Sequence, residues 1–317
     1  MALDEATSLL VKQMAEARPK PLYEMSPREA REFLERMRPQ YGEVPRMANV
    51  EDHRVPVTGG SIRVRVLDPS GNPQGVIVYY HGGGWVVGSI DSSDQLGRRL
   101  AEQTNCVVVL VDYRLAPEYR FPTAVQDAYA ALRWTDGRLD QLAGRRVPTI
   151  VAGDSAGGNL AAVMALKARD TGELPIHLQI LIYPVTDCDF DTDSYRDPEN
   201  ALMLTRESMI WFWDHYAPEP AGRAHPDASP LRAPDLSNLA PAVVLTAEHD
   251  VLMAEGDSYA QRLVQSDVPV RYHCFDGQMH GFLTMLDVLP GSDAGLRYIA
   301  GAVHEHLASS TRLRGVS

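Results

Sequence analysis

Short apolar segments of strand length alternate with segments of helical periodicity over most of this chain. The expected strands are residues 76–80, 106–111, 149–152, 178–183, 243–247 and 270–275. The expected helices are residues 94–103, 122–134, 255–265 and 296–307, with a further one directly after Gly158. Such alternation is typical of a mostly parallel sheet covered by helices on both faces, so we expect an α/β fold.

Two regions depart from this alternation. Residues 5–17 have helical spacing, and Ser26-Pro27-Arg28-Glu29 predicts a second helix with a capping box and proline at its first position. Residues 50–57 and 62–67 alternate as an antiparallel pair at one edge of the sheet. An acidic stretch over 186–200 and a helix around 209–213 interrupt the pattern later in the chain.

The segment Gly153-Asp154-Ser155-Ala156-Gly157 lies where a strand should turn sharply into a helix. A serine at such a turn has a strained backbone and an exposed hydroxyl, and the flanking glycines remove Cβ atoms that would collide. An ordinary glycine-rich connection has the same local pattern. A nucleophilic Ser155 therefore also requires a histidine base and a carboxylate to orient it.

His280 and Asp250 are the expected base and acid. Each follows a predicted strand, which places both at the carboxyl edge of the sheet, where ligand and catalytic groups gather. The chain order serine, aspartate, histidine is that of the α/β hydrolases. Glu248 is the rival acid, and Asp250 could instead cap the helix that follows it. His249 is expected in a loop.

The run His81-Gly82-Gly83-Gly84-Trp85 follows the strand 76–80. Its glycines allow backbone N–H groups to approach an oxyanion, so Gly83 and Gly84 are expected to donate together with the amide of Ala156. The run could also cradle a phosphate, but no lysine follows and no G-x-G-x-x-G pattern continues into the helix. His81 is expected to shape this loop.

Composition excludes several partners. The 42 acidic and 30 basic residues give a net charge of −12, which disfavours nucleic acid and stable membrane association. The three cysteines have no metal-ligand spacing. The strongest apolar run, 106–111, is too short to span a bilayer, and the start of the chain does not read as a targeting signal. We expect a cytoplasmic protein without a metal or an organic cofactor.

Several motifs together resemble the hormone-sensitive lipase-like carboxylesterases, bacterial family IV. They are the glycine run, the serine turn, the Asp250 and His280 segments, and Tyr113-Arg114-Leu115-Ala116-Pro117-Glu118. The resemblance extends from Gly75 to the C-terminus, although Val251 stands where the family usually has proline. It implies an α/β-hydrolase fold with a helical cap. The expected division is 1–45 (N-terminal part of the cap), 46–185 (core), 186–225 (cap insertion) and 226–317 (core).

The resemblance implies a serine carboxylesterase that hydrolyses small esters with short to medium acyl chains through an acyl-enzyme. It also implies a possible homodimer. Side chains that could line the substrate pocket are Trp85, Met209, Trp213 and Phe282, with Met203, Leu204 and Phe212 as further candidates, although ordinary packing explains them equally well. We expect a scaffold ion pair between Arg114 and Glu118, and a structural or tuning role for Asp154. An amidase or peptidase on the same fold and a non-catalytic binding homologue are the alternatives.

Overall fold

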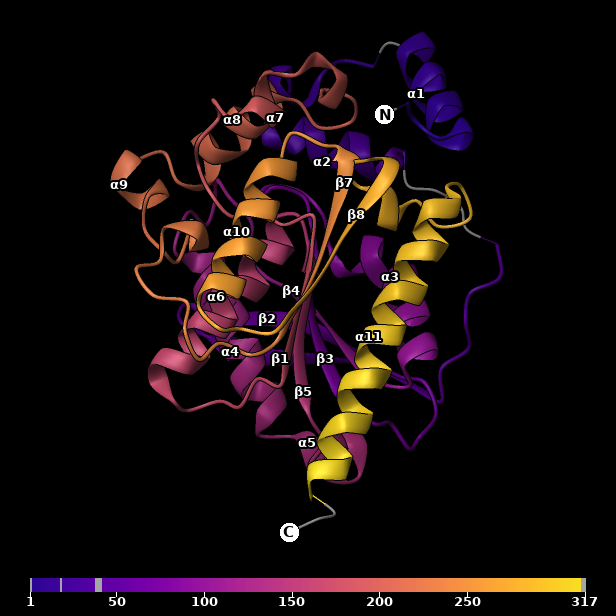
Figure 1. The fold of residues 1–317 in the computed structure, drawn as a ribbon, viewed down its shortest axis with the longest axis vertical. Helices are drawn as coiled ribbons and strands as arrows, with labels where there is room; N and C mark the ends of the chain where they lie inside the picture. Colours follow the sequence, from indigo (N-terminus) through magenta and orange to yellow (C-terminus); the bar gives the residue numbers. More distant parts are fainter. Residues whose placement is uncertain (1, 18, 38–41, 315–317) are drawn as a thin grey trace.

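A computed structural model describes residues 2–17, 19–37 and 42–314, and an eight-stranded sheet runs through its centre (Figure 1). The strand order is β1-β2-β4-β3-β5-β6-β7-β8. The strands are β1 Asn49–Val57, β2 Gly60–Asp68, β3 Val76–Tyr80, β4 Val107–Asp112, β5 Thr149–Asp154, β6 Leu178–Ile182, β7 Ala242–His249 and β8 Val270–Met279. Strands β3 to β8 are parallel, whereas β2 is antiparallel to both β1 and β4. The predicted α/β architecture and its antiparallel edge are confirmed.

Helices cover both faces of the sheet. Helices α3 Ile90–Thr104 and α11 Pro290–Arg314 lie on one face (Figure 1). The other face is covered by α4 Thr123–Asp136, α6 Ala156–Thr171 and α10 Met253–Gln265, with the short α5 Leu139–Ala143 near the end of the sheet away from α1. In β4, Val107, Val109 and Val111 pack in one core and Val108 and Leu110 in the other. Burial on both faces explains why the central strands are mostly apolar and do not alternate with polar residues.

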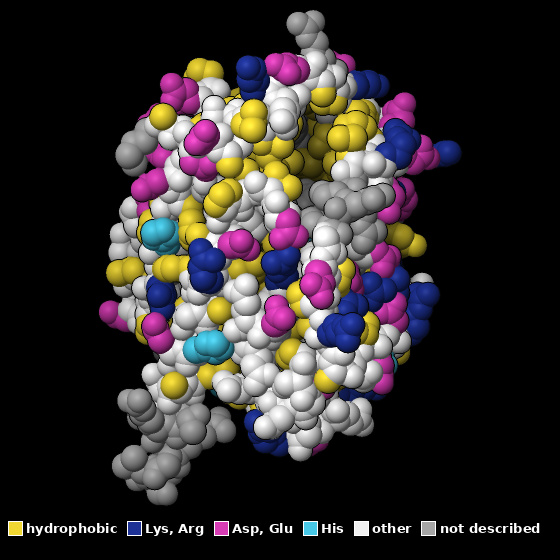
Figure 2. All heavy atoms as spheres, turned by 90° about the vertical axis from the view of Figure 1, so that its right-hand side faces the viewer, with side chains coloured by type: hydrophobic (Ala, Val, Ile, Leu, Met, Phe, Trp, Pro, Cys, Tyr) yellow, Lys and Arg dark blue, Asp and Glu magenta, His cyan; other side chains and the backbone are white. Residues whose placement is uncertain are grey.

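Helical segments from two distant parts of the chain lie at the same end of the molecule (Figure 1). The first part contains α1 Glu5–Ala17, η1 Leu22–Glu24 and α2 Pro27–Arg36, where Ser26 forms the predicted capping box with Glu29. The second contains α7 Asp193–Arg196, η2 Pro198–Asn200 and α8 Arg206–Tyr216. Further short helices are α9 Pro220–Arg223, η3 Pro230–Arg232 and η4 Phe282–Thr284. On the face shown in Figure 2, that end is hollowed and lined with hydrophobic side chains.

Some element ends differ from the sequence prediction. Strand β8 continues to Met279, because after an irregularity at Ala247 its last residue pairs with His249 of β7. His249 is therefore a buried strand residue and not the expected loop residue. Helix α3 begins at Ile90, earlier than predicted, because Ser89 caps it by accepting the Ser92 N–H at 3.2 Å. Within the described ranges, no helix is both long enough and apolar enough to cross a membrane.

Candidate active site

Ser155 lies in the tight turn between β5 and α6. Its φ of 55° and ψ of −118° are unusual for a residue with a Cβ atom. Its N–H donates to the Ile182 carbonyl at 2.9 Å, which holds the turn in place. A Cβ atom on Gly157 would lie 1.9 Å from the Tyr80 carbonyl oxygen, and one on Gly153 would lie 2.3 Å from the Gly157 carbonyl. The turn therefore has the strained geometry, and the need for glycine on both sides, that the sequence indicated.

The structure brings Ser155 together with His280 and Asp250. His280 Nε2 lies 3.0 Å from Ser155 Oγ, and its Nδ1 lies 2.7 Å from Asp250 Oδ2. Asp250 is fully buried, and its second oxygen accepts the Leu252 N–H at 2.9 Å. This carboxylate therefore orients the imidazole and also binds the turn before α10. With an Nδ1–H directed at Asp250, Nε2 can accept a proton from the serine hydroxyl.

The rival groups point elsewhere. The Glu248 carboxylate accepts the Gly277 N–H at 2.8 Å, on the segment of β8 that precedes His280. His81 is buried, lies with Nδ1 2.7 Å from the Gly82 carbonyl oxygen, and stacks on Tyr113 with ring centroids 4.4 Å apart. Burial lowers the pKa of His81 and favours its neutral form. His81 therefore shapes the glycine loop, as the sequence indicated, and does not contact Ser155.

The glycine loop after β3 adopts a conformation that requires glycine. Gly83 has φ +111° and Gly84 has φ +56°. A Cβ atom on Gly83 would lie 2.3 Å from the Val87 carbonyl oxygen, and one on Gly84 would lie 2.2 Å from the Phe212 ring of α8. Among the residues that the structure describes, no acceptor takes the N–H of Gly83, Gly84 or Ala156. These amides are therefore free to donate to a developing negative charge, and the N–H of Ala156 lies in the first turn of α6.

Asp154 joins this loop to the nucleophile turn. Its Oδ1 accepts the Gly82 N–H at 2.9 Å and the Tyr79 hydroxyl at 2.7 Å. Burial raises the pKa of Asp154, and these two hydrogen bonds oppose that shift. The residue is adjacent in sequence to Ser155, so one carboxylate ties the serine turn to the loop that carries the N–H donors.

The predicted ion pair between Arg114 and Glu118 is wrong. Arg114 instead donates to both oxygens of Asp127, at 2.7 and 2.8 Å, and Glu118 pairs with Arg31 of α2. Asp127 is fully buried in α4, and a buried carboxylate requires such a partner. Sequence reasoning missed Arg31, because nothing in the sequence indicates a contact between residues 87 positions apart.

The four side chains predicted first for the pocket are buried in two different places. Trp85 stacks on Tyr216 with ring centroids 4.1 Å apart and meets Trp213 edge-on at 4.9 Å, and Met209 belongs to the same core. Phe282 lies in the core on the other face of the sheet. Contact of any of them with substrate stays a prediction.

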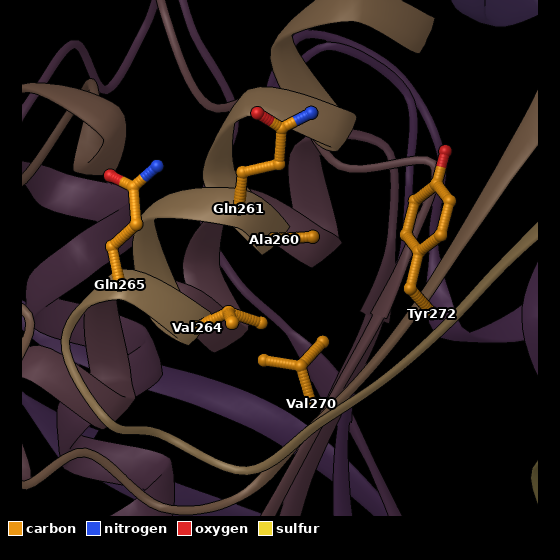
Figure 3. Close-up of a pocket in the computed structure, with 6 residues that line it drawn as sticks. All are labelled: Ala260, Gln261, Val264, Gln265, Val270 and Tyr272. Carbon is orange, nitrogen blue, oxygen red and sulfur yellow. The ribbon is translucent and has the colours of Figure 1, made fainter.

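A cavity of about 270 Å³ lies away from the serine turn (Figure 3). It opens between α10 and the edge strand β8 and is lined by Ala260, Gln261, Val264, Gln265, Val270 and Tyr272. None of these residues belongs to the candidate site. In the described parts of the chain, no group of three or more His, Cys, Asp or Glu side chains is arranged to hold a metal ion.

Comparison with known proteins finds close similarity. A family model described as alpha/beta hydrolase fold matches residues 77–284. The ethyl acetate hydrolase of Pseudomonas putida is 40% identical over 232 residues, which are 73% of each chain. The carboxylesterase NlhH of Mycobacterium tuberculosis is 39% identical over 236 residues, 72% of this chain and 74% of the relative. The structure of an ester hydrolase from the metagenome of Lake Arreo, in complex with a bipyridine phosphonate derivative, has a TM-score of 0.91 and 33% identity, covering 96% of this chain and 99% of its own.

Proposed function

Since the chain belongs to the hormone-sensitive lipase-like family of α/β-hydrolase carboxylesterases, we propose that Ser155, His280 and Asp250 are its catalytic triad and that its substrates carry short to medium acyl chains. The protein is a carboxylic ester hydrolase. The observation that carries the proposal is the continuous line of hydrogen bonds from Ser155 Oγ through the His280 ring to Asp250.

The proposed reaction proceeds in two acyl transfers. Ser155 Oγ attacks the ester carbonyl carbon while His280 Nε2 takes the hydroxyl proton, and Asp250 stabilises the imidazolium that forms. The tetrahedral intermediate collapses, the carbon–oxygen bond to the alcohol breaks, and His280 returns the proton to the leaving oxygen. Water then gives its proton to the same nitrogen and attacks the acyl-enzyme, which releases the acid and restores Ser155.

The negative oxygen of each tetrahedral intermediate accepts hydrogen bonds from the amides of Gly83, Gly84 and Ala156. The positive φ angles of the two glycines and the position of Ala156 at the start of α6 support this assignment. Within the residues that the structure describes, no protein acceptor takes any of the three N–H groups. Donors that are fixed before the reaction stabilise developing charge without reorganisation.

We further propose that residues 1–45 and 186–225 form the cap, and that 46–185 and 226–317 form the core. Helices α1, α2, α7 and α8 of these two segments lie at one end of the molecule (Figure 1). A Cβ atom on Gly84 would lie 2.2 Å from the Phe212 ring of α8, so this helix is close to the glycine loop. A cap in this place covers the reacting groups, because Ser155, Asp250 and His280 all follow strands at the carboxyl edge of the sheet.

A series of p-nitrophenyl esters from acetate to palmitate tests the substrate class. We expect kcat/KM to be highest for acyl chains of short to medium length, as the ethyl acetate hydrolase relative suggests. Highest activity on palmitate would overturn the chain-length proposal. Matched p-nitroanilides test the amidase alternative, and comparable rates on anilides would favour it.

The variant Ser155→Ala tests the mechanism, since it should lose ester hydrolysis. Turnover equal to that of the unchanged protein would contradict a nucleophilic role for Ser155. A fluorophosphonate that labels Ser155 in the unchanged protein, located by peptide mass spectrometry, would separate an active hydrolase from a non-catalytic binding homologue.

We also propose that two copies of the chain associate through β8. This strand is an edge of the sheet, its own Tyr272 is 37% exposed, and Val264 of the adjacent α10 is 58% exposed. Light scattering after size exclusion should give the mass of a dimer. Val264→Glu should shift it to a monomer, whereas Val288→Glu, at an exposed valine between η4 and α11, should not. A monomeric mass for the unchanged protein would overturn this proposal.

A further inference from the structure

The guanidinium group of Arg31 makes four hydrogen bonds from α2 to the body of the protein. Its Nε donates to the Val86 carbonyl oxygen at 2.8 Å, and its Nη2 donates to the Ala116 carbonyl oxygen at 2.7 Å. Nη1 and Nη2 also donate to the two carboxylate oxygens of Glu118, at 2.8 and 2.7 Å. The Arg31 side chain is 29% exposed, so much of this contact is withdrawn from solvent.

The Val86 carbonyl lies in the loop that carries the proposed oxyanion donors, and the Ala116 carbonyl lies in the segment after β4, which is hydrogen-bonded to that loop. The N–H of Val86 donates to the Gly83 carbonyl oxygen at 3.0 Å. The N–H of Ala116 donates to the Trp85 carbonyl oxygen at 2.9 Å. The glycine loop is therefore held at two points. Asp154 accepts the Gly82 N–H near its start, and Arg31 donates to the Val86 carbonyl oxygen near its end.

A surface ion pair does not explain this arrangement. Arg28, one turn earlier on α2, makes an exposed pair with Glu32 of its own helix. Pairs of that kind contribute little to stability. The planar fork of Arg31 makes four hydrogen bonds in fixed directions, whereas the ammonium group of lysine has only three N–H donors at a single nitrogen.

We propose that Arg31 is a positioning residue for the oxyanion loop, tying cap helix α2 to the turn that holds the amides of Gly83 and Gly84. The inference rests on the proposed role of those amides. Oxyanion donors must lie about 2.7–3.1 Å from the negative oxygen to be effective. A displacement of about 1 Å in an active site can lower the rate by up to about 100-fold. Loss of one of the two anchors should therefore lower kcat and leave ground-state binding of the ester nearly unchanged.

The test compares Arg31→Ala with Arg28→Ala in the full chain, using p-nitrophenyl butyrate. We expect Arg31→Ala to lower kcat about tenfold with KM within a factor of about two. Arg28→Ala, which removes a neighbouring arginine of the same helix, should retain both constants. Affinity for a trifluoromethyl ketone, whose adduct with Ser155 carries an oxyanion, should fall in the same proportion as kcat. A role limited to stability would leave that affinity unchanged in the folded variant.

Two results would overturn the inference. One is a kcat for Arg31→Ala within a factor of two of the Arg28→Ala value. The other is a raised KM with unchanged kcat, which would mean that Arg31 only seats the cap for substrate binding. If Arg31→Ala does not fold, as judged by thermal melting, Arg31→Lys decides by the same criteria, since it keeps the charge and loses the fork. Fluorophosphonate labelling of Ser155 in the unchanged protein separates failure of this inference from failure of the proposed function.

Discussion

Replacement of Ser155, the proposed nucleophile, by glycine should relieve backbone strain in the turn between β5 and α6. A residue with a Cβ atom held at φ 55° and ψ −118° costs about 1–3 kcal/mol, and glycine does not incur this cost. The comparison is between Ser155→Gly and Ser155→Ala. Both variants lack the hydroxyl and its hydrogen bond with His280, so their difference reports only the backbone and one methyl group.

The adjacent Ala156 provides the matched control. It is fully buried and begins α6 with ordinary helical geometry. Ala156→Gly should cost about 1 kcal/mol in backbone freedom and about 0.8 kcal/mol in lost burial, together about 2 kcal/mol. Exchanging alanine for glycine at position 155 has the same cost of about 2 kcal/mol. The relief of backbone strain, about 1–3 kcal/mol, is subtracted from it. Ser155→Gly should therefore lie within about 1 kcal/mol of Ser155→Ala, on either side.

Calorimetric melting temperatures distinguish a strained turn at Ser155 from an unstrained one. For a chain of this length, 1 kcal/mol corresponds to about 1.5 °C. Ser155→Gly should melt about 1.5–4.5 °C above the double variant Ser155→Ala with Ala156→Gly, which carries the same number of glycines. Equal melting temperatures for these two inactive proteins would refute the reasoning that the nucleophile turn stores strain.

Three further changes test the site. Gly84 has φ +56°, and Gly84→Ala would place a Cβ atom 2.2 Å from the Phe212 ring. We therefore expect kcat for p-nitrophenyl acetate to fall by about 100-fold or more. An unchanged kcat would argue against the oxyanion assignment. Asp250→Asn should lower kcat by about 10⁴-fold, while Glu248→Gln leaves it within a factor of about three, and a reversed order would make Glu248 the acid. Burial raises the pKa of Asp154 above its ordinary 3.8, so the folded state binds this proton more tightly than the unfolded chain does. The stability that this group contributes is then full below about pH 3.8 and is lost as the pH rises through the folded pKa. Asp154→Asn keeps an acceptor oxygen and should gain stability over the unchanged protein between pH 4 and pH 7 in urea denaturation, whereas a difference independent of pH would contradict the shift.

The sequence predicted the sheet well because its central strands are buried on both faces. Strands β4 and β5 are apolar over most of their length, and glycine, proline or polar residues separate them from the helices. The end of β8 was missed because Asp276-Gly277-Gln278 has the composition of a loop. Backbone pairing with β7 extends the strand through these residues all the same, which local composition does not encode.

Groups at strand ends were also predictable, whereas contacts between distant side chains were not. Ser155, Asp250 and His280 each follow a strand, so their meeting follows from the parallel topology. The partners of Arg114 and Glu118 depend on how α2 and α4 pack, and spacing along the chain carries no information about that. Pocket residues are hard to predict for a similar reason. An aromatic side chain that packs in a core and one that faces substrate have the same sequence pattern.

The glycine loop, with its proposed oxyanion donors, shows why the site needs contacts that no motif encodes. Glycines permit the conformation of the loop at Gly83 and Gly84, but the same freedom leaves the loop poorly determined by its own backbone. Precision must then come from neighbours. Asp154 supplies one hydrogen bond from the nucleophile turn, and Arg31 supplies two from a helix of the proposed cap. If both anchors act on the donors, changes in the cap should alter kcat as well as substrate choice, because the cap then helps to hold the groups that stabilise the transition state.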